Sequence, residues 1–354
     1  MRLPRIKGRG RCIYSCHSRA VEGCVILGSA QTRQQMLSRL RRLAAFMGIR
    51  ILAYILMRTH FHLLLEVNDS KPLSLKKVLR RIRAYYGAGR VQELLEQVKG
   101  IGDLAERKKR LEELLEPFRA RMNDLSIFMK ELKGGFAQWY NQSHGRTGVL
   151  WAERFKSVLL EAGYAVAAAA TYIDLNPVRA GLCTDPKDYG YCGYAEALAR
   201  GSPEDQENLR IILDLPETTS WEELSREYHK HLFETEALAS ESLAVFGPDQ
   251  VEKDVDQENG ERKAADLWRG RVRYFRDGVI LGSRAFVQFH LERLKEKLSY
   301  KRKRGPVATE IFPRADLWAF RKMRAQKSGE DVSIRLQTPE SPTQNSQAPQ
   351  NQML

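Results

Sequence analysis

The stretch that decides the fold reads Ile51-Leu-Ala-Tyr-Ile-Leu-Met-Arg-Thr-His-Phe-His-Leu-Leu-Leu-Glu-Val67. It has no glycine or proline and is rich in aliphatic and aromatic residues, which is typical of a β-strand. His60 and His62 are two residues apart, so in a strand both side chains lie on one face, about 7 Å apart along the chain. Such a pair could bind one metal ion, or could equally be core histidines. The opposite face is apolar, and we expect it to pack on helices through Phe61, Leu63 and Leu65.

The sequence before this strand predicts the start of an α+β domain. Residues 12–16 and 24–27 are short strand candidates. From Thr32 to Met47 apolar residues recur at helical spacing, with arginines on the outer face, and Gly48 ends the pattern. This order of elements favours an α+β fold in which an antiparallel sheet has helices packed on one side.

The sequence after this strand is mainly helical. Residues 73–133 have helical patterns, and about 90–120 is so dense in Glu, Lys and Arg that we interpret it as an inserted charged helical pair. An alanine-rich helix is expected at 161–175 and is stopped by Pro177.

We divide the chain into four parts. Residues 1–195 are expected to form the main domain, and 196–220 a linker. An accessory region follows at 221–304, with a helix that a capping box at Ser220 starts, a strand at 273–281 and a helix capped by Ser283. This region could bind DNA, or could serve in dimerisation or capping. Residues 305–354 are expected to be mostly disordered, because Gln, Ser, Pro and Asn are frequent from about residue 327 onward.

The composition indicates a polyanionic partner. The 354 residues include 58 Lys and Arg against 44 Asp and Glu, a net charge of +14, and a balance this basic usually means nucleic acid. No apolar run is long enough for a membrane span, and the N-terminus lacks the apolar region of a signal peptide. The five cysteines include no Cys-x-x-Cys pair, which favours reduced thiols. We therefore expect a cytoplasmic, nucleoid-associated protein.

Tyr172 and Asn176 are the candidates that could complete a site around the histidine pair. They are four residues apart, so they share one face of the expected helix. An Asn carbonyl beside His60 and His62 would make a neutral site that suits Mg²⁺ or Mn²⁺. A tyrosine one turn away could then attack a phosphorus atom. On spacing alone, a core tyrosine and a helix-terminating asparagine remain the simpler interpretation.

Three ordered motifs resemble a known family. His60-Phe-His-Leu-Leu-Leu-Glu66 is similar to the HUH motif (His, hydrophobic residue, His) of single-tyrosine transposases. Together with Tyr140-Asn-Gln-Ser-His-Gly-Arg-Thr-Gly-Val-Leu-Trp-Ala-Glu-Arg-Phe-Lys-Ser157 and Tyr172-Ile-Asp-Leu-Asn-Pro-Val-Arg-Ala-Gly-Leu182, it closely resembles the REP-associated tyrosine transposases of bacteria. The likeness covers about residues 1–195 without the charged insert, and implies an RRM-like fold.

The resemblance implies a role for each residue of the site. It makes His60, His62 and Asn176 the ligands of the divalent ion, and Tyr172 the nucleophile that cuts single-stranded DNA through a 5′-phosphotyrosine link. The chain departs from the family where Arg58-Thr59 replaces a usual Pro-Asn. It also departs where Tyr14-Ser-Cys-His-Ser-Arg-Ala20 replaces a Tyr-His-Val-Thr-like strand followed by Arg-Gly.

The basic residues near these motifs are candidates for DNA contacts. Cations interleaved with aromatic residues suit single strands and hairpins, although Trp151 and Phe155 could equally be core and the cations a solvated face. Other arginines, including those of 39–42 and 80–83, fit diffuse electrostatics better than base recognition. The candidate DNA-binding residues are Arg19, Arg146, Arg154, Lys156 and Arg179.

The sequence thus predicts a metal-dependent, single-tyrosine DNA endonuclease and strand transferase that acts on hairpin-forming, REP-like repeats. Its partner would be single-stranded or hairpin DNA, and the protein would be a monomer or a homodimer. One alternative is a repeat-binding regulator on the same scaffold that no longer cuts DNA. Another is a metal-dependent hydrolase that uses water as the nucleophile.

Overall fold

The computed structural model describes residues 6, 8, 10–68, 73–243, 274–275, 278–298, 305–309 and 317–321. The chain divides into two units, Met1–Lys322 and Met323–Leu354, and the second lies outside the described residues, as does the expected basic cluster at 301–304.

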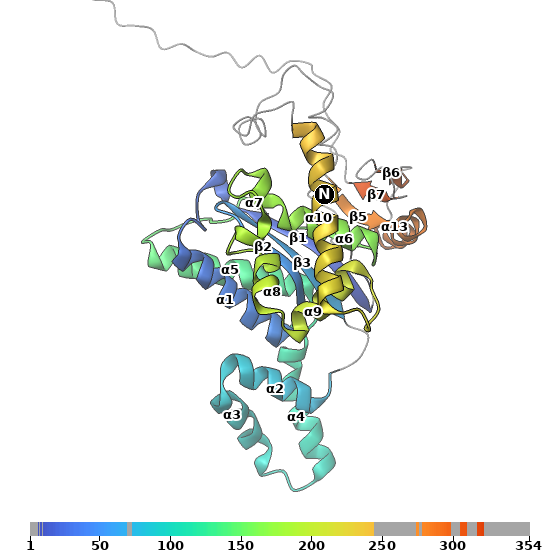
Figure 1. Cartoon of the computed structure of the whole chain (residues 1–354). Coiled ribbons are helices and arrows are strands. Elements are labelled where there is room, and N and C mark those ends of the chain that lie inside the picture. Colours follow the sequence, from blue (N-terminus) through green and yellow to red (C-terminus); the bar gives the residue numbers. More distant parts are fainter. Residues whose placement is uncertain are drawn as a thin grey trace, which may run out of the picture. The chain divides into compact units, whose positions relative to one another are not determined.

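The centre of the fold is an antiparallel sheet that brings the N-terminal half of the chain together (Figure 1). Its strands are β1 (Arg11–Arg19), β2 (Arg50–Leu56), β3 (His60–Asn68) and β4 (Lys156–Leu160), in the order β2-β3-β1-β4. All neighbours in this group are antiparallel. β1 and β3 are therefore central, each with a neighbour on both sides. Residues 24–27, a second strand candidate, are instead a loop after a 3₁₀ turn (Val21–Gly23).

Three C-terminal strands extend the same sheet. β5 (Gly278–Gly282) pairs with β4 in parallel, and β7 (Trp318–Arg321) and β6 (Val307–Ala308) follow in antiparallel pairing, which gives seven strands in the order β2-β3-β1-β4-β5-β7-β6. β5 pairs the outer edge of β4, which would otherwise present unpaired backbone groups. The helix expected after Ser283 is present (α13, Arg284–Leu298), whereas the strand expected at 273–281 begins only at Gly278, because residues 274 and 275 are helical. Part of the expected tail therefore belongs to the sheet.

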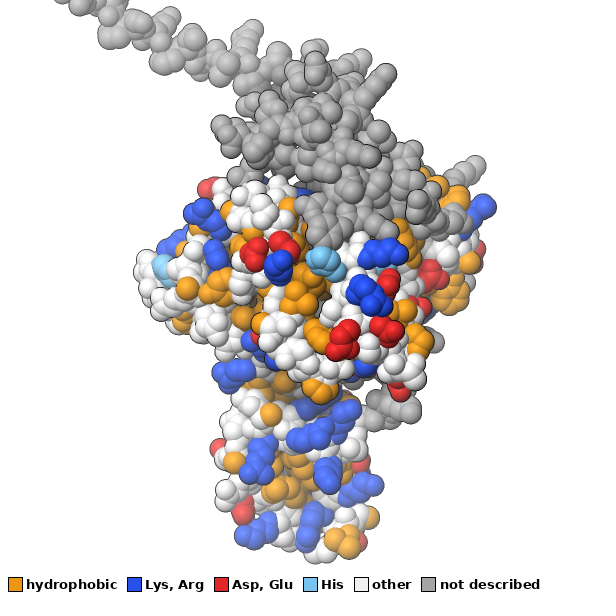
Figure 2. Space-filling view, viewed as in Figure 1, with side chains coloured by type: hydrophobic (Ala, Val, Ile, Leu, Met, Phe, Trp, Pro, Cys, Tyr) orange, Lys and Arg blue, Asp and Glu red, His pale blue; other side chains and the backbone are white. Residues whose placement is uncertain are grey.

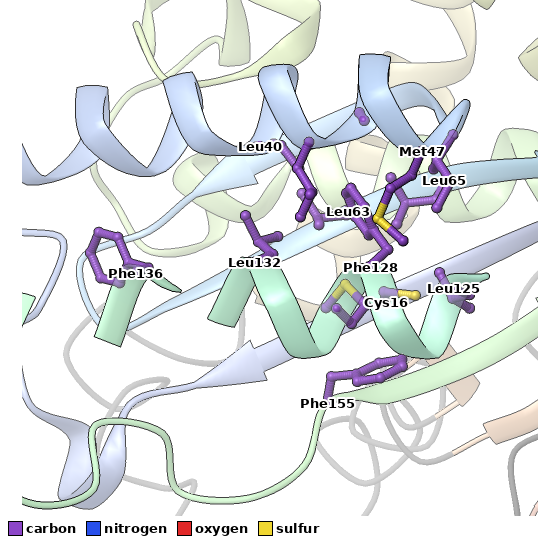
Figure 3. Close-up of a cluster of buried hydrophobic side chains, with 14 of the residues drawn as sticks. Cys16, Leu40, Met47, Leu63, Leu65, Leu125, Phe128, Leu132, Phe136 and Phe155 are labelled. Atoms are coloured by element: carbon purple, nitrogen blue, oxygen red, sulfur yellow. The ribbon is translucent and has the colours of Figure 1, made fainter. Parts of the chain in front are cut away.

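One face of the sheet packs on two long helices, α1 (Ala30–Met47) and α5 (Leu125–Ser143). Side chains of both helices meet those of β1 and β3 in a buried cluster, shown in Figure 3. The expectation that Phe61, Leu63 and Leu65 pack on helices is confirmed, because all three are fully buried in this cluster.

The opposite face is also covered by helices, so the α+β class is confirmed but the helices are not confined to one side. α6 (Tyr164–Asp174), α8 (Gly193–Arg200), α9 (Pro203–Leu213) and α10 (Trp221–Leu243) form this layer. Its apolar strand residues include Ile13, Leu64 and Val158, which need cover from water. The small alanines of α6 are buried from Ala165 to Ala170 and let that helix lie close to the sheet.

Residues 196–220, expected to be a linker, are mostly helical. α9 begins with a capping box between Ser202 and Asp205 and buries Leu209 and Ile212. Its side chains reach the sheet, where the Asn208 amide donates to the carbonyl of Ile51 at 3.1 Å. Burial of this apolar face against the second layer explains why the polar sequence does not form a linker.

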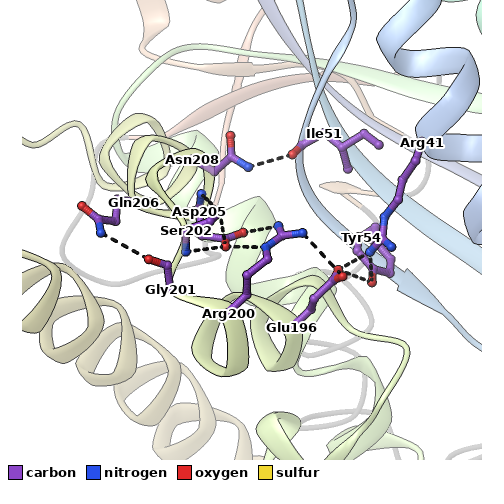
Figure 4. Close-up of polar contacts among 10 residues, drawn as sticks. All are labelled: Arg41, Ile51, Tyr54, Glu196, Arg200, Gly201, Ser202, Asp205, Gln206 and Asn208. Atoms are coloured by element: carbon purple, nitrogen blue, oxygen red, sulfur yellow. Dashed lines mark hydrogen bonds and ion pairs between the residues drawn. The ribbon is translucent and has the colours of Figure 1, made fainter. Parts of the chain in front are cut away.

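A polar network attaches the same helices to β2 and α1, shown in Figure 4. Glu196 of α8 accepts a hydrogen bond from the Tyr54 hydroxyl at 2.9 Å and pairs with Arg41 of α1. Arg200 forms two bonds to Asp205, at 2.8 and 2.5 Å. These bonds connect α8 with α9 and with the strand next to β3.

The segment after β3 forms three further helices, α2 (Leu75–Tyr86), α3 (Ala88–Lys99) and α4 (Leu104–Arg119). α3 and α4 correspond to the charged pair expected at about 90–120. Leu94 and Leu115 are buried and join the cluster beneath α1.

Candidate active site

A row of basic side chains crosses the face of the sheet that α6 covers. His62 of β3 lies opposite His17 of β1, and His17 lies opposite Lys156 of β4. Cross-strand neighbours project from the same face, with Cβ atoms about 5 Å apart. The register alone therefore places two imidazoles and one ammonium group side by side.

The two histidines of the motif lie together at the start of β3. The ring centres of His60 and His62 are 5.2 Å apart, and the ring planes are nearly perpendicular, at 84°. His62 is 2% exposed, whereas His60 is partly exposed. Thr59 Oγ1 lies 3.0 Å from His60 Nδ1. A bond at Nδ1 leaves Nε2 as the nitrogen of His60 that could bind an ion.

Tyr172 lies directly against this pair. Its ring centre is 5.5 Å from that of His62, at 84°, and the residue is only 6% exposed. Phe275 stacks on the same phenol ring at 4.9 Å and 17°. The guanidinium carbon of Arg179 is 4.9 Å from the ring centre. Helix α6, strand β3 and the C-terminal region therefore meet at this one tyrosine.

Asn176 stands one turn after Tyr172, at the start of the short helix α7 (Asn176–Arg179). Its Nδ2 donates to the carbonyls of Tyr172 at 2.7 Å and Ile173 at 3.1 Å. Because both bonds use the amide nitrogen, the side-chain oxygen is the atom that could act as a metal ligand. His60, His62 and Asn176 are thus the residues of this region that could hold a divalent ion.

Within the described part of the chain, no group of three or more His, Cys, Asp and Glu side chains is arranged to hold a metal ion.

A buried carboxylate supports the helix from its other side. Asp174 is 1% exposed, and it accepts hydrogen bonds from the Tyr228 hydroxyl at 2.5 Å and the Cys192 thiol at 3.3 Å. Burial raises the pKa of Asp174 to about 7, and the two hydrogen bonds partly oppose this shift. Asp174 therefore connects α6 to α10 just behind Tyr172.

The candidate DNA-binding residues fall into two groups. Arg19 lies opposite His60, Lys156 opposite His17, and Arg179 over Tyr172, where its Nη1 also donates to the Tyr172 carbonyl at 2.9 Å. Arg146 instead lies over the ring of Tyr140, at 6.0 Å, and Arg154 is exposed in the segment that leads into β4.

The aromatic residues of the motif from Tyr140 to Ser157 likewise fall into a buried and a more exposed group. Trp151 and Phe155 are 8% and 6% exposed and belong to the first core cluster, so for these two the core interpretation holds. Tyr140 and His144 form a stack near the surface with ring centres 4.0 Å apart.

His17 is a site residue that the sequence analysis did not assign. Its ring stacks on that of His62, with centres 5.4 Å apart and planes at 25°. The sequence indicated only that His17 lies near the first expected strand. Which residue of β1 lies opposite His62 depends on the pairing of β1 with β3, and the sequence does not give that pairing.

The comparisons with known proteins found likeness only among solved structures, where four chains match. No protein-family model matches the chain, and no curated protein does. Among solved structures, a REP-associated tyrosine transposase bound to a REP hairpin is similar over 58% of this chain and 88% of that chain, at 15% identity and a TM-score of 0.31. A likeness at this level carries no conclusion about function. Separately, none of the described helices is both long and apolar enough to cross a membrane.

Proposed function

We propose that this chain is a single-tyrosine DNA endonuclease and strand transferase that acts on single-stranded DNA next to a hairpin. The observation that carries the proposal is the contact between Tyr172 and His62, with ring centres 5.5 Å apart. A phenol beside two imidazoles and an amide oxygen is a suitable set for nucleophilic attack at a phosphate. The three motifs that resemble the tyrosine transposases support the same assignment.

The proposed reaction is a transesterification. The Tyr172 oxygen attacks the phosphorus of a phosphodiester, a new P–O bond forms, and the bond to the 3′ oxygen breaks. The products are a 5′-phosphotyrosine on the protein and a free 3′ hydroxyl, which takes up a proton equivalent to the one that the phenol loses. Attack by a 3′ hydroxyl on the phosphotyrosine reverses these changes, so rejoining requires no nucleotide cofactor.

The residues around the phenol fit this chemistry. A phenol has a pKa of about 10 when unperturbed, so deprotonation during attack needs nearby positive charge. The Arg179 guanidinium over the ring offers such charge. Lys156 and Arg19, opposite His17 and His60, would bind phosphate oxygens of the strand. A divalent cation bound by His60, His62 and Asn176 would further neutralise charge on the phosphate.

Covalent trapping tests the proposal. The protein is incubated with Mn²⁺ and a labelled hairpin that carries single-stranded flanks, and denaturing electrophoresis then detects a protein–DNA adduct. We expect the wild-type protein to form the adduct and Tyr172→Phe to form none. Tyr164→Phe is the matched control, because Tyr164 is the first residue of the same helix and is 37% exposed. An adduct that persists in Tyr172→Phe would contradict the assignment of the nucleophile.

The alternative is a repeat-binding protein that does not cut DNA. One observation favours it: Tyr172 is 6% exposed and stacked by Phe275, so its ring is covered. The same experiment separates the two functions, since a silent regulator binds the hairpin but forms no adduct and no cleaved product. Cleavage without any adduct would indicate a hydrolase that uses water.

A further inference from the structure

Helix α2 carries a set of exposed cations that the proposed chemistry does not use. Its sequence, Leu-Lys-Lys-Val-Leu-Arg-Arg-Ile-Arg-Ala-Tyr-Tyr, includes no acidic residue. Val78 and Ile82 are buried and anchor one face of the helix. At 3.6 residues per turn the other face carries four exposed cations, which we call the α2 stripe. The stripe consists of Lys76, Lys77, Arg80 and Arg83.

The neighbouring helices differ in their charge balance. In α3 and α4, cations pair with carboxylates one turn away on the same helix: Arg90 with Glu93 at 2.7 Å, Lys99 with Glu96 at 3.3 Å, and Arg110 with Glu113 at 2.9 Å. Such pairs partly neutralise each other, whereas α2 has no carboxylate of its own. Lys and Arg side chains gather on the visible face of the α2–α4 segment in Figure 2.

Arg42 of α1 adds a further cation beside α2. It donates to the carbonyl of Tyr85 at 3.3 Å, and its guanidinium carbon is 5.6 Å from the Tyr85 ring centre. The basic surface therefore continues from α2 onto α1.

The α2 stripe lies away from the candidate active site. Helix α2 packs near the C-terminal end of α1, where Arg81 fills the space beside Gly48. β2 begins two residues later at Arg50, opposite Glu66, while His60 is at the other end of β3. His60 is six residue steps along the strand from Glu66, which is about 20 Å.

We propose that the α2 stripe binds the phosphate backbone of double-stranded DNA, the stem of the hairpin whose flank lies in the active site. This inference rests on the proposed function. From Lys76 to Arg83 the helix rises about 10 Å, which spans about three phosphates of one strand at 3.4 Å each. Four flexible cations at this spacing suit a backbone and carry no base recognition.

The aromatic residues of α2 favour duplex over single-stranded DNA as the occupant. Binding of single strands commonly uses exposed rings on which bases stack. Tyr85 is instead stacked on Phe46, with ring centres 4.8 Å apart. Tyr86 is 41% exposed, but its ring is in contact with Phe46 at 5.5 Å and Phe118 at 5.6 Å, and the Arg121 guanidinium lies over it at 5.8 Å. The stripe therefore offers charge without a stacking platform.

The test measures how affinity for DNA depends on salt. The α2 variant changes Lys76, Lys77, Arg80 and Arg83 to Gln, which preserves helix propensity. The control variant changes the same number of exposed cations in α3 and α4, namely Lys99, Lys108, Lys109 and Arg110. Both are made in the full chain with Tyr172→Phe to prevent cleavage. Fluorescence anisotropy follows binding to a labelled hairpin with a flank, and to the flank alone, across a series of NaCl concentrations. Circular dichroism checks that each variant is folded.

We expect the α2 variant to bind the hairpin at least about 10-fold more weakly near 0.1 M salt. The slope of log K against log salt should fall by about 2.7, since about three duplex phosphate contacts are lost and each contributes about 0.9. The control should retain the slope, and binding of the flank alone should be unchanged in both. Equal losses in the two variants, or no loss in the α2 variant, would overturn the proposal. Binding to phosphatidylglycerol vesicles that needs the stripe, with no stripe-dependent binding to DNA, would also overturn it.

Adduct formation separates this inference from the proposed function. For this measurement the four α2 substitutions are made in protein that retains Tyr172. At a saturating concentration of hairpin, this α2 variant should form the covalent adduct at the wild-type level. If no protein forms an adduct but the α2 variant still loses the salt dependence, the proposed function fails while the stem-binding surface stands.

Discussion

His17 is a third imidazole beside the two histidines of the motif. It is buried, with 7% exposure, and its ring stacks on His62 at 5.4 Å. His62 is therefore stacked on His17 and lies nearly perpendicular to the rings of His60 and Tyr172. A ring enclosed on several sides keeps one orientation, and groups that fix the orientation of a metal ligand commonly change metal affinity 10- to 100-fold.

We expect His17→Ala to weaken Mn²⁺ binding about 10-fold, because His62 gains freedom to rotate. His17→Phe preserves a flat ring at the same place, so its affinity for Mn²⁺ should fall much less. Electron paramagnetic resonance of free Mn²⁺ during titration of the protein measures both affinities without DNA. If the phenylalanine variant is as weak as the alanine variant, the stack is not what His17 contributes.

At the scale of residues, the sequence allowed part of the site to be predicted. The two-residue spacing of His60 and His62 on one strand was sufficient to place them on a common face, and the helix with Tyr172 does pack against that face. His17 could not be placed this way, since its position depends on the register of two strands about 45 residues apart in sequence. Arg146 and Arg154 lie in irregular segments, whose course depends on tertiary contacts rather than on local pattern.

At the scale of elements, helix α6 depends on α10 for its position. The connection is the buried hydrogen bond from the Tyr228 hydroxyl to Asp174, at 2.5 Å, with the Cys192 thiol as a second donor. A buried carboxyl group without such donors would be strongly destabilising. α10 lies outside the three motifs, yet it supports the helix that presents the candidate nucleophile.

The stability of the fold should depend on pH through Asp174. Its pKa is raised by burial from 3.8 to about 7. Between these values the folded protein keeps a proton that the unfolded chain has lost, so this group's contribution to stability falls as pH rises from about 4 to 7. The whole effect is on the order of 4 kcal/mol. Asp174→Asn should lack it, so wild-type stability should decline relative to this variant over that range.

Urea unfolding at several pH values between 4.5 and 7.5, in buffer with EDTA, measures this difference. Asp188→Asn is the control, because Asp188 is exposed and its variant should follow the wild-type pH dependence. If the free energy of unfolding changes with pH in the same way for wild type and Asp174→Asn, then Asp174 does not keep its proton in the folded state.

The elements with strong local signals were the ones that could be predicted from sequence. The capping pattern at Ser220 is present as reciprocal bonds between Ser220 and Glu223, at 3.1 and 3.3 Å. Ser283 likewise accepts a bond from the Phe286 amide at 3.2 Å. α9 was missed although a capping box at Ser202 and Asp205 starts it. The rest of its sequence is mostly polar, and only its packing on the second layer shows which of its residues are apolar anchors.

At the scale of the whole molecule, the C-terminal region completes the sheet on which the site is built. β5 pairs with β4, and Leu281 and Ala319 are buried in the same cluster as Tyr172. Phe275 stacks on that tyrosine. The sheet therefore makes strands β5, β6 and β7 part of the fold that surrounds the site. Sequence alone could not indicate this, because the strands are short and their partner lies more than 100 residues earlier.

A chain that ends at Leu243 should be much less stable than the full protein. It loses the buried side chains of Ile280, Leu281 and Phe320, each worth about 2 kcal/mol of burial, and leaves the edge of β4 unpaired. We expect its melting temperature to fall by about 10 °C or more, as measured by circular dichroism. A chain that ends at Lys322 is the control and should melt within about 2 °C of the full protein. Equal melting of all three would show that β5–β7 do not stabilise the sheet.

The parallel pairing of β4 with β5 has a consequence for synthesis of the protein. Gly282 leaves the ribosome about 120 residues after Leu160, which at 5–20 residues per second is roughly 6–24 s later. During that interval a nascent chain has an open strand edge, and the ring that covers Tyr172 has not yet been made. We therefore expect that a chain released early from a broken message aggregates or is degraded, so that a damaged message does not yield a folded fragment with Tyr172 uncovered.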